Sequence, residues 1–203
     1  MEFLVDMTTH VPAGTTPQHV DDVRAREAAR ARELVAEGHL LRLWRPPLAP
    51  GEWRTFGLFA ADDADQLEQK LASMPLRIWR TDVVTPLPAH PNDPGGGSAS
   101  PELTEFLTTL TIAVPPGISA DEVVDRTAGE AVRAAELARQ GRLVRLWRLT
   151  AEPGQRRTLG LWAGADEAEL TSTLQSLPLY AWMSAEITPL SVHPSDPARR
   201  AAA

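Results

Sequence analysis

The stretch Leu43-Trp44-Arg45 occurs a second time as Leu146-Trp147-Arg148, 103 residues further along the chain. Around these two triplets the similarity extends in both directions without a gap, so that residues 2–94 align with residues 105–197. A self-match that runs through nearly the whole chain indicates a tandem duplication. The sequence therefore predicts two domains of one fold, each built from one copy of the repeat.

The domain boundaries follow from this alignment and from the composition between the copies. We expect the first repeat at residues 1–91, a linker at residues 92–104, the second repeat at residues 105–197 and a short tail at residues 198–203. The linker is rich in glycine, serine and proline, which bury little apolar area, and this is typical of a flexible tether.

Each repeat shows the pattern of a βαββαβ unit. Phe3, Val5 and Met7 alternate with more polar residues, which predicts a strand. Thr16 and Pro17 are a typical start for a helix, which continues to Gly38. Further strands are predicted at residues 39–45, 54–60 and 78–87, with a short helix between Asp63 and Pro75. The order is that of a split βαβ fold of class α+β.

An antiparallel sheet with both helices on one face leaves its other face uncovered. A second, identical sheet in the same chain can cover that face. We therefore expect the two repeats to pack sheet to sheet as a dimeric-type α/β barrel, with a small-molecule cavity between each sheet and its helices.

Charge and composition exclude several classes of partner. The 203 residues carry 20 basic and 27 acidic side chains, which argues against a broad basic surface for nucleic acid or anionic lipid. There is no cysteine, no basic leader before an apolar segment and no apolar stretch long enough for a membrane span. We expect a cytoplasmic protein that binds a small molecule, with no nucleic acid or membrane partner.

A glutamate lies in the apolar stripe of each long helix. Val20, Glu27 and Leu34 are spaced by seven residues, and Glu130 holds the same position in the second repeat. Burial raises the pKa of a carboxyl group, as a general base that works near neutral pH requires. Glu27 and Glu130 are the candidate catalytic residues. The alternative is that Glu27 pairs with Arg24 or Arg30 at the solvent edge of the helix.

Arginine, tryptophan and histidine side chains are the candidate substrate-binding groups. Each second strand has arginines on both faces, so one of them is expected to face the cavity and bind a carboxylate, or else to extend into solvent. The tryptophans either line the cavity or, as the favoured alternative, fill the core, and each histidine before proline either closes a pocket or, as favoured, forms a turn. These candidates are Arg42, Trp44, Arg45, Trp79 and His90, with Arg145, Trp147, Arg148, Trp182 and His193.

Cofactor and metal motifs are absent from the sequence. The five histidines show no metal-ligand spacing, and there is no glycine-rich phosphate loop or dinucleotide fingerprint. We expect either chemistry that uses neither a metal nor a cofactor, or no chemistry at all.

Five blocks in register resemble one family in each repeat. They are Glu2-Phe3-Leu4-Val5, the helix with Glu27 that ends at Glu37-Gly38, Leu43-Trp44-Arg45, Met74-Pro75-Leu76 and His90-Pro91. Together they resemble muconolactone delta-isomerase, and the second repeat resembles it equally. The resemblance implies a ferredoxin-like fold and a cofactor-free 1,3-proton shift on muconolactone in bacterial aromatic catabolism. It places the family's helix glutamate at Glu27 and Glu130, and a basic residue near it at Arg24.

The resemblance also implies self-association, because the family forms a decamer of single repeats. A fused chain of two repeats would form a pentamer if that assembly is kept. Thr127 stands where the first repeat has Arg24, which predicts that the two sites are unequal. Two alternatives stay open: a cofactor-free cyclase or oxygenase that acts on a polyketide-like aromatic compound, and a non-catalytic binding or scaffold protein.

Overall fold

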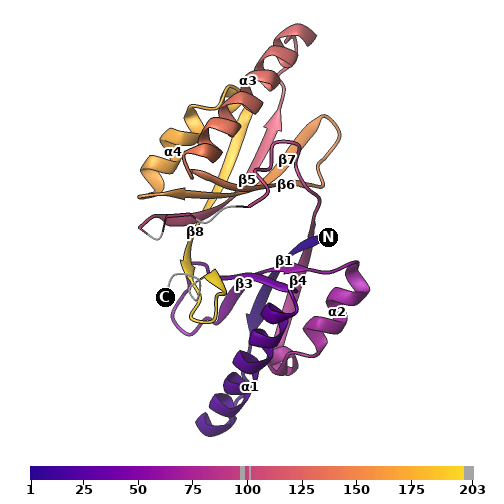
Figure 1. The fold of residues 1–203 in the computed structure, drawn as a ribbon, viewed down its shortest axis with the longest axis vertical. Helices are drawn as coiled ribbons and strands as arrows, with labels where there is room; N and C mark the ends of the chain where they lie inside the picture. Colours follow the sequence, from indigo (N-terminus) through magenta and orange to yellow (C-terminus); the bar gives the residue numbers. More distant parts are fainter. Residues whose placement is uncertain (97–98, 101, 199–203) are drawn as a thin grey trace. The chain divides into compact units, whose positions relative to one another are not determined.

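The computed structural model describes residues 1–96, 99–100 and 102–198. These residues form two compact units. Unit 1 contains Met1–Leu87 and the chain from Ser191 onward, and unit 2 contains Pro88–Leu190. Within each unit, two helices lie on one face of a four-stranded antiparallel sheet (Figure 1).

Unit 1 has the strand order β4-β1-β3-β2. Its elements are β1 (Glu2–Thr9), α1 (Pro17–Ala36), β2 (Leu40–Arg45), β3 (Arg54–Ala60), α2 (Ala64–Ala72), the 3₁₀ helix η1 (Pro75–Trp79) and β4 (Arg80–Leu87). In unit 2 the order β8-β5-β7-β6 is the same arrangement one repeat later. Its elements are β5 (Thr104–Ala113), α3 (Ala120–Arg139), β6 (Leu143–Leu149), β7 (Gln155–Gly164), α4 (Glu167–Gln175), η2 (Tyr180–Trp182) and β8 (Met183–Val192).

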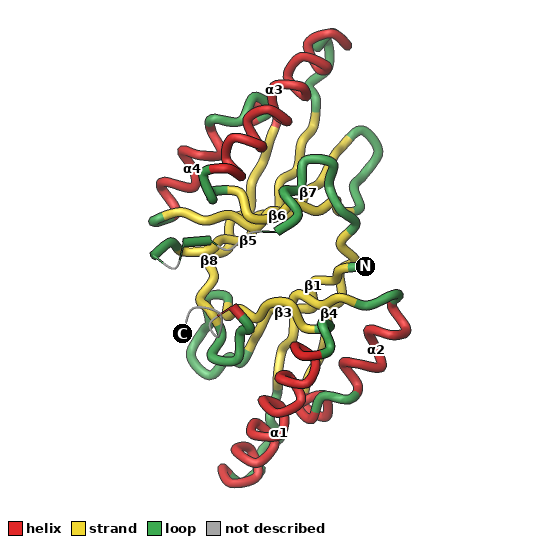
Figure 2. The backbone as a smooth tube through the Cα atoms, viewed as in Figure 1, coloured by secondary structure: helices red, strands yellow, loops and turns green. Residues whose placement is uncertain are grey.

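Local chemistry explains the element boundaries. The Thr16 hydroxyl accepts a hydrogen bond from the His19 amide and caps α1, and Ser119 caps α3 through the Glu122 amide. Alternate residues of β1 are buried, and α1 buries Val23, Ala31 and Leu34 against the sheet. The prediction of an α+β fold made of two ferredoxin-like repeats is confirmed. Figure 2 shows the alternation of strands and helices.

One local prediction is wrong. The last strand of the first repeat begins at Arg80 rather than at Ile78, because the chain after Pro75 first forms a 3₁₀ turn in which Ile78 is 70% exposed. The side chains of β2 do not alternate strictly, since a bulge between Leu40 and Arg42 shifts the register against β3. The expected sheet-to-sheet packing concerns the placement of one unit against the other and stays a prediction.

The end of each repeat packs in the unit built on the other repeat. Residues 88–93, here called the first arm, belong to unit 2, where Ala89 pairs with Trp147 of β6. Residues 191–196, the second arm, belong to unit 1, where Val192 pairs with Trp44 of β2. The two repeats therefore exchange equivalent segments. Of the predicted linker, Gly97, Ser98 and Pro101 lie outside the described residues, as does the predicted tail from Arg199 onward.

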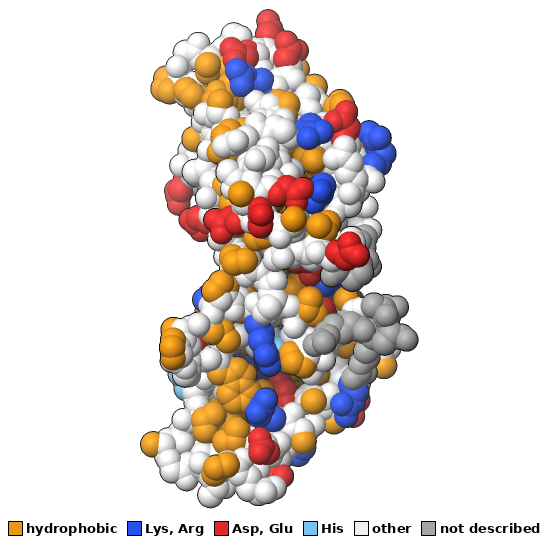
Figure 3. Space-filling model, turned by 90° about the vertical axis from the view of Figure 1, so that its left-hand side faces the viewer, with side chains coloured by type: hydrophobic (Ala, Val, Ile, Leu, Met, Phe, Trp, Pro, Cys, Tyr) orange, Lys and Arg blue, Asp and Glu red, His pale blue; other side chains and the backbone are white. Residues whose placement is uncertain are grey.

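The surface mixes charges of both signs. On the face drawn in Figure 3, acidic and basic side chains are interspersed with hydrophobic ones. This agrees with the modest net charge of -7. Among the described residues, no helix is both long enough and apolar enough to cross a bilayer.

Candidate active site

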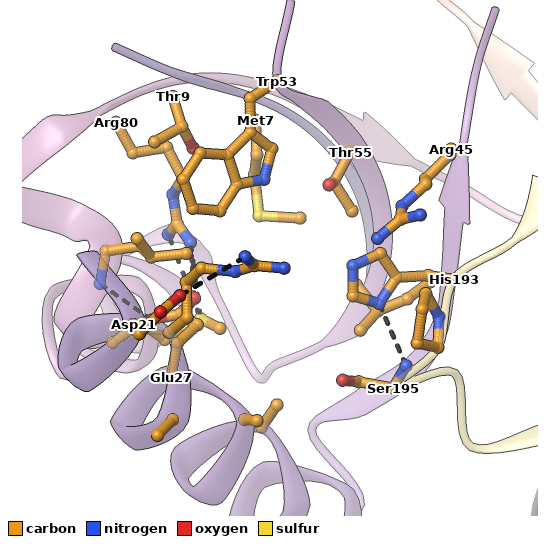
Figure 4. Close-up of a pocket in the computed structure, with 18 residues that line it drawn as sticks. Met7, Thr9, Asp21, Glu27, Arg45, Trp53, Thr55, Arg80, His193 and Ser195 are labelled. Atoms are coloured by element: carbon orange, nitrogen blue, oxygen red, sulfur yellow. Dashed lines mark hydrogen bonds and ion pairs between the residues drawn. The ribbon is translucent and has the colours of Figure 1, made fainter. Parts of the chain in front are cut away.

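Unit 1 contains a cavity of about 320 Å³ between its sheet, α1 and the second arm. Glu27 and Ala31 of α1 line it, as do Met7 and Thr9 of β1. The second arm completes the lining with His193, Pro194 and Ser195. In Figure 4, Glu27 and Arg80 lie on one side of this cavity, and Arg45 and His193 lie on the other.

The Glu27 carboxylate is buried at the inner end of this cavity. Its side chain is 13% exposed. The amide of Leu76 donates a hydrogen bond to Oε2 at 2.8 Å, and Arg80 donates from Nη1 to Oε1 at 3.1 Å. Burial is the largest influence on the pKa of Glu27 and raises it. The hydrogen bond from the Leu76 amide and the charge of Arg80 lower this pKa, but by less. Glu27 does not pair with Arg24 or Arg30, the alternative considered from the sequence. Arg24 contacts Asp21 instead, and Arg30 contacts Glu33.

Arg80 belongs to a buried charge network behind Glu27. The side chains of Arg80 and Asp82 are each 2% exposed, and Arg80 Nε lies 2.6 Å from Asp82 Oδ1. Arg77 Nη1 lies 2.8 Å from Asp82 Oδ2 and completes the network. Burial is the main reason that the pKa of Glu27 stays raised although a guanidinium touches it, and the charge of Asp82 acts in the same direction as burial.

The outer part of the cavity is cationic. Arg24 lies over the Trp53 ring, 5.5 Å from its centroid, and both residues line the cavity together with Arg45. His193 Nδ1 accepts a hydrogen bond from the Ser195 amide at 3.1 Å, so the proton of the neutral ring resides on Nε2. Burial, followed by the charges of Arg45 and Arg24, lowers the pKa of His193 to about 4. The histidine is therefore neutral near pH 7.

Unit 2 contains an equivalent cavity of about 300 Å³. The Leu179 amide donates to Glu130 Oε2 at 3.0 Å, and burial raises the pKa of Glu130. His90 of the first arm lines this cavity, and its Nδ1 accepts from the Asn92 amide at 3.1 Å. Burial lowers the pKa of His90 as well.

A buried carboxylate, here called the latch, fastens each arm. Asp196 is fully buried, accepts from the Leu43 amide at 2.9 Å and binds the Arg42 guanidinium at 3.2 Å. Asp93 does the same in unit 2 with the Leu146 amide and Arg145. Asp93 belongs to the linker predicted from the sequence, whereas its carboxylate binds Arg145 and the Leu146 amide. Because the backbone amide of each latch residue donates to the carbonyl of the cavity-lining histidine in its arm, the latch fixes the position of that histidine.

The structure separates the predicted site residues into two groups. Those that line the two cavities are Glu27, Arg24, Arg45 and His193 in the first and Glu130, Arg148 and His90 in the second. Arg42 and Arg145 instead hold the arms and lie over the buried rings of Trp44 and Trp147, with 4.8 Å to each ring centroid. Trp79 contacts His19 edge to face, and Trp182 lies beneath Arg126. These four tryptophans are absent from both cavity linings.

Sequence reasoning missed Arg80, Trp53 and Arg156. Arg80 has no counterpart in the second repeat, where Met183 stands at the equivalent position, so a search for features shared by both copies does not find it. The joint change from Arg80 and Asp82 to Met183 and Ala185 is the signal that points to a buried ion pair in one copy only.

Fold and site together define an α+β protein with two ferredoxin-like units, each with a desolvated carboxylate in a small-molecule cavity. The sequence model of the family named muconolactone delta-isomerase matches residues 1–93 and 104–196. The chain belongs to the muconolactone delta-isomerase family, and its relatives are isomerases.

Individual relatives agree with this assignment. The muconolactone delta-isomerase of Cupriavidus pinatubonensis is 34% identical over 92 residues, which is 45% of this chain and 97% of the relative. That of Acinetobacter baylyi is 31% identical over 90 residues, which is 44% of this chain and 91% of the relative. A heme-binding protein from Thermus thermophilus is 12% identical, with a TM-score of 0.58 over 99% of this chain and 95% of that one. The last likeness shows the fold alone.

Proposed function

We propose that this protein catalyses a 1,3-proton shift on an unsaturated lactone such as muconolactone, or on a related enolisable carboxylic acid. The observation that carries the proposal is the half-buried carboxylate in each cavity, Glu27 or Glu130, together with arginines and a neutral histidine in the same lining. Family membership supports the same reaction.

In the proposed reaction the glutamate moves one proton between two carbons. The ionised carboxylate takes the proton from the γ carbon, the ring carbon that bears the lactone oxygen, and the C–H electron pair moves into a dienolate. The same carboxyl group then gives a proton to the carbon next to the lactone carbonyl, and the double bond shifts from the α,β to the β,γ position. No other reactant is consumed, and burial keeps the carboxylate basic enough for the first step.

Two kinds of group complement this base. Arg24 and Arg45 at the outer end of the first cavity are placed to bind the substrate carboxylate, for which a guanidinium offers paired donors. The Nε2–H group of neutral His193 is the donor available to the oxygen that gains negative charge in the dienolate. In unit 2, Arg148, Arg156 and His90 take these parts.

The raised pKa of both glutamates predicts the pH dependence of turnover. The reaction needs an ionised glutamate, so kcat/KM falls as the pH decreases through the pKa of the base. Because burial raises that pKa above 4.5 in both cavities, the acidic limb of the profile is expected above pH 4.5. A pH–rate profile with muconolactone measures this limb. A limb centred at or below pH 4.5 would contradict the role of these two residues.

A double variant tests the function. Glu27→Gln with Glu130→Gln keeps the size of both side chains and removes both bases, so turnover of muconolactone is expected to fall roughly 10²–10⁴-fold. The control is Glu33→Gln with Glu136→Gln, which changes two equivalent glutamates of the same helices that lie outside the cavities. Equal turnover by the two double variants would refute the proposal.

Cytoplasmic location, turnover without a cofactor and self-association stay predictions. Sedimentation analysis of the purified chain tests the last of these. A mass of five chains is the expected result, and a monomer at all concentrations would contradict it.

A further inference from the structure

We propose that the two cavities are separate sites for different substrates: the second takes an unsaturated lactone or acid with an alkyl group beside the carbon that exchanges its proton. This inference rests on the proposed function, since it assigns a substrate class to each of the two glutamates. The evidence lies in the positions at which equivalent residues of the two cavity linings differ.

The inner end of each cavity, next to the glutamate, differs most. In unit 1 the Arg80 guanidinium lines this end and binds Glu27 at 3.1 Å. In unit 2 the equivalent residue is Met183, which lines the cavity of Glu130. Asp82 is replaced at the same time by Ala185, so the whole buried ion pair is exchanged for apolar side chains. An alkyl group of the ligand placed against Arg80 would bury the guanidinium charge further. Against Met183 the same alkyl group would have an apolar and adaptable contact.

Neighbouring lining positions change in the same direction. Thr9 of the first cavity corresponds to Ile112 of the second. Trp162 also lines the second cavity. Its indole N–H donates a hydrogen bond to the Thr108 hydroxyl at 3.0 Å, so the ring is fixed and its one polar group already has a partner. The second cavity thus has Ile112, Trp162 and Met183 among its lining residues.

The outer end of the second cavity remains suited to an acid. Arg148 and Arg156 line it, and Arg156 occupies the position of Trp53. Thr127, where the first repeat has Arg24, also lines it, and its buried hydroxyl has no hydrogen-bond partner among the described residues. This hydroxyl is available to a ligand oxygen. The second ligand therefore keeps a carboxylate and differs from the first in its apolar part.

The methionines of the chain provide a probe for each cavity. Met7 and Met74 line the first cavity, Met183 lines the second, and Met1 is 62% exposed outside both. The full-length protein, labelled with ¹³C at the methionine methyl groups, is titrated with muconolactone and with a ring-alkylated muconolactone. Single Met→Leu variants assign the four signals. Met1 is the internal control for changes outside the cavities.

The expected result is a crossed preference. Muconolactone should shift the methyl signals of Met7 and Met74 at lower concentration than that of Met183. The alkylated compound should shift the Met183 signal first. In each case the dissociation constants of the two cavities should differ about tenfold. Equal dissociation constants at the two cavities for both compounds, within about twofold, would overturn the inference. The readout is binding, so a crossed preference without turnover would refute the proposed function and leave this inference standing.

A paired substitution adds a second test. Arg80→Met with Asp82→Ala gives the first cavity the inner wall of the second and removes both charges together. It should lower the dissociation constant of the alkylated compound at Met7 about tenfold. Thr9→Ile is the alternative change if the pair prevents folding, and it should act in the same direction. No change in either variant would overturn the inference.

Discussion

Arg80 shows how one side chain sets the chemistry of its neighbour. Its guanidinium donates to the Glu27 carboxylate and lowers the pKa of that group, whereas burial, the largest influence, and the charge of Asp82 raise it. A charge at this depth needs its counter-charge, because a lone buried ion is far more costly than a buried pair. The second repeat agrees, since it lacks both members and keeps its glutamate desolvated.

Stability measurements on this pair form a first prediction. Arg80→Met alone leaves Asp82 buried near Glu27 with Arg77 as its remaining partner, and should lower the free energy of unfolding by roughly 3–5 kcal/mol. Arg80→Met with Asp82→Ala should cost clearly less than the single change, although it removes more groups. Urea unfolding measures both. A double variant that is less stable than Arg80→Met would contradict this account of the pair.

His193 gives a prediction about pH. Its pKa is about 4 in the folded protein against 6.5 for an ordinary histidine. Between pH 4 and pH 6.5, the His193 ring is therefore protonated when the second arm is undocked and neutral when the arm is docked. The docked arm is therefore fully stable above pH 6.5 and loses stability as the pH falls towards 4. NMR titration of the His193 ring should give a midpoint near 4, and His193→Gln should remove this part of the pH dependence. A midpoint at 6.5 or above would be incompatible with a buried ring.

Among the elements, the helices and the strand order could be predicted from sequence, whereas the arms could not. The caps at Thr16 and Ser119 and the period-two pattern of β1 are local signals, and they predict the correct fold. The two arms share the pattern His-Pro-x-Asp at equivalent positions, so comparison of the repeats does not show which arm packs in which unit. The 3₁₀ helix η1 was missed because its apolar residues also suit a strand.

The arm latches lead to a prediction at the scale of elements. Asp196→Asn removes a buried charge that accepts from the Leu43 amide and Arg42, and should weaken docking of the second arm by roughly 1–3 kcal/mol. The amide of His193 donates to the Leu43 carbonyl at 3.2 Å, so its hydrogen exchange should become faster. Asp93→Asn is the matched control, which should affect the first arm and leave the His193 amide protected. Unchanged exchange in Asp196→Asn would show that the carboxylate does not fasten the arm.

The whole molecule is a duplication in which each cavity uses residues from both repeats. His193, at the end of the second repeat, lines the cavity of Glu27, and His90 lines the cavity of Glu130. Neither repeat alone therefore contains a complete site. The sequence predicts the two glutamates and the two histidines as candidates, but their combination across repeats follows only from the exchange of the arms.

Truncation tests this mutual dependence. A chain that ends at Val192 lacks the cavity-lining residues of the second arm. With Glu130→Gln, so that only the first cavity works, this truncation should lower turnover at least about tenfold, because the neutral histidine that faces the base is lost. With Glu27→Gln, so that only the second cavity works, the same truncation should have little effect. Loss of activity in the second cavity instead would show that each arm serves its own repeat.

The most direct test of the central claim follows the proton itself. Muconolactone is incubated with the protein in deuterated buffer, and ¹H and ²H NMR locate the label in the product. The account predicts that deuterium, which reaches the glutamic acid by exchange with the buffer, enters only at the carbon next to the lactone carbonyl. It also predicts that Glu27→Gln with Glu130→Gln lowers isomerisation and labelling by the same roughly 10²–10⁴-fold factor. Labelling by the double variant at the rate of the unchanged protein would contradict the claim that these two buried carboxylates carry the proton.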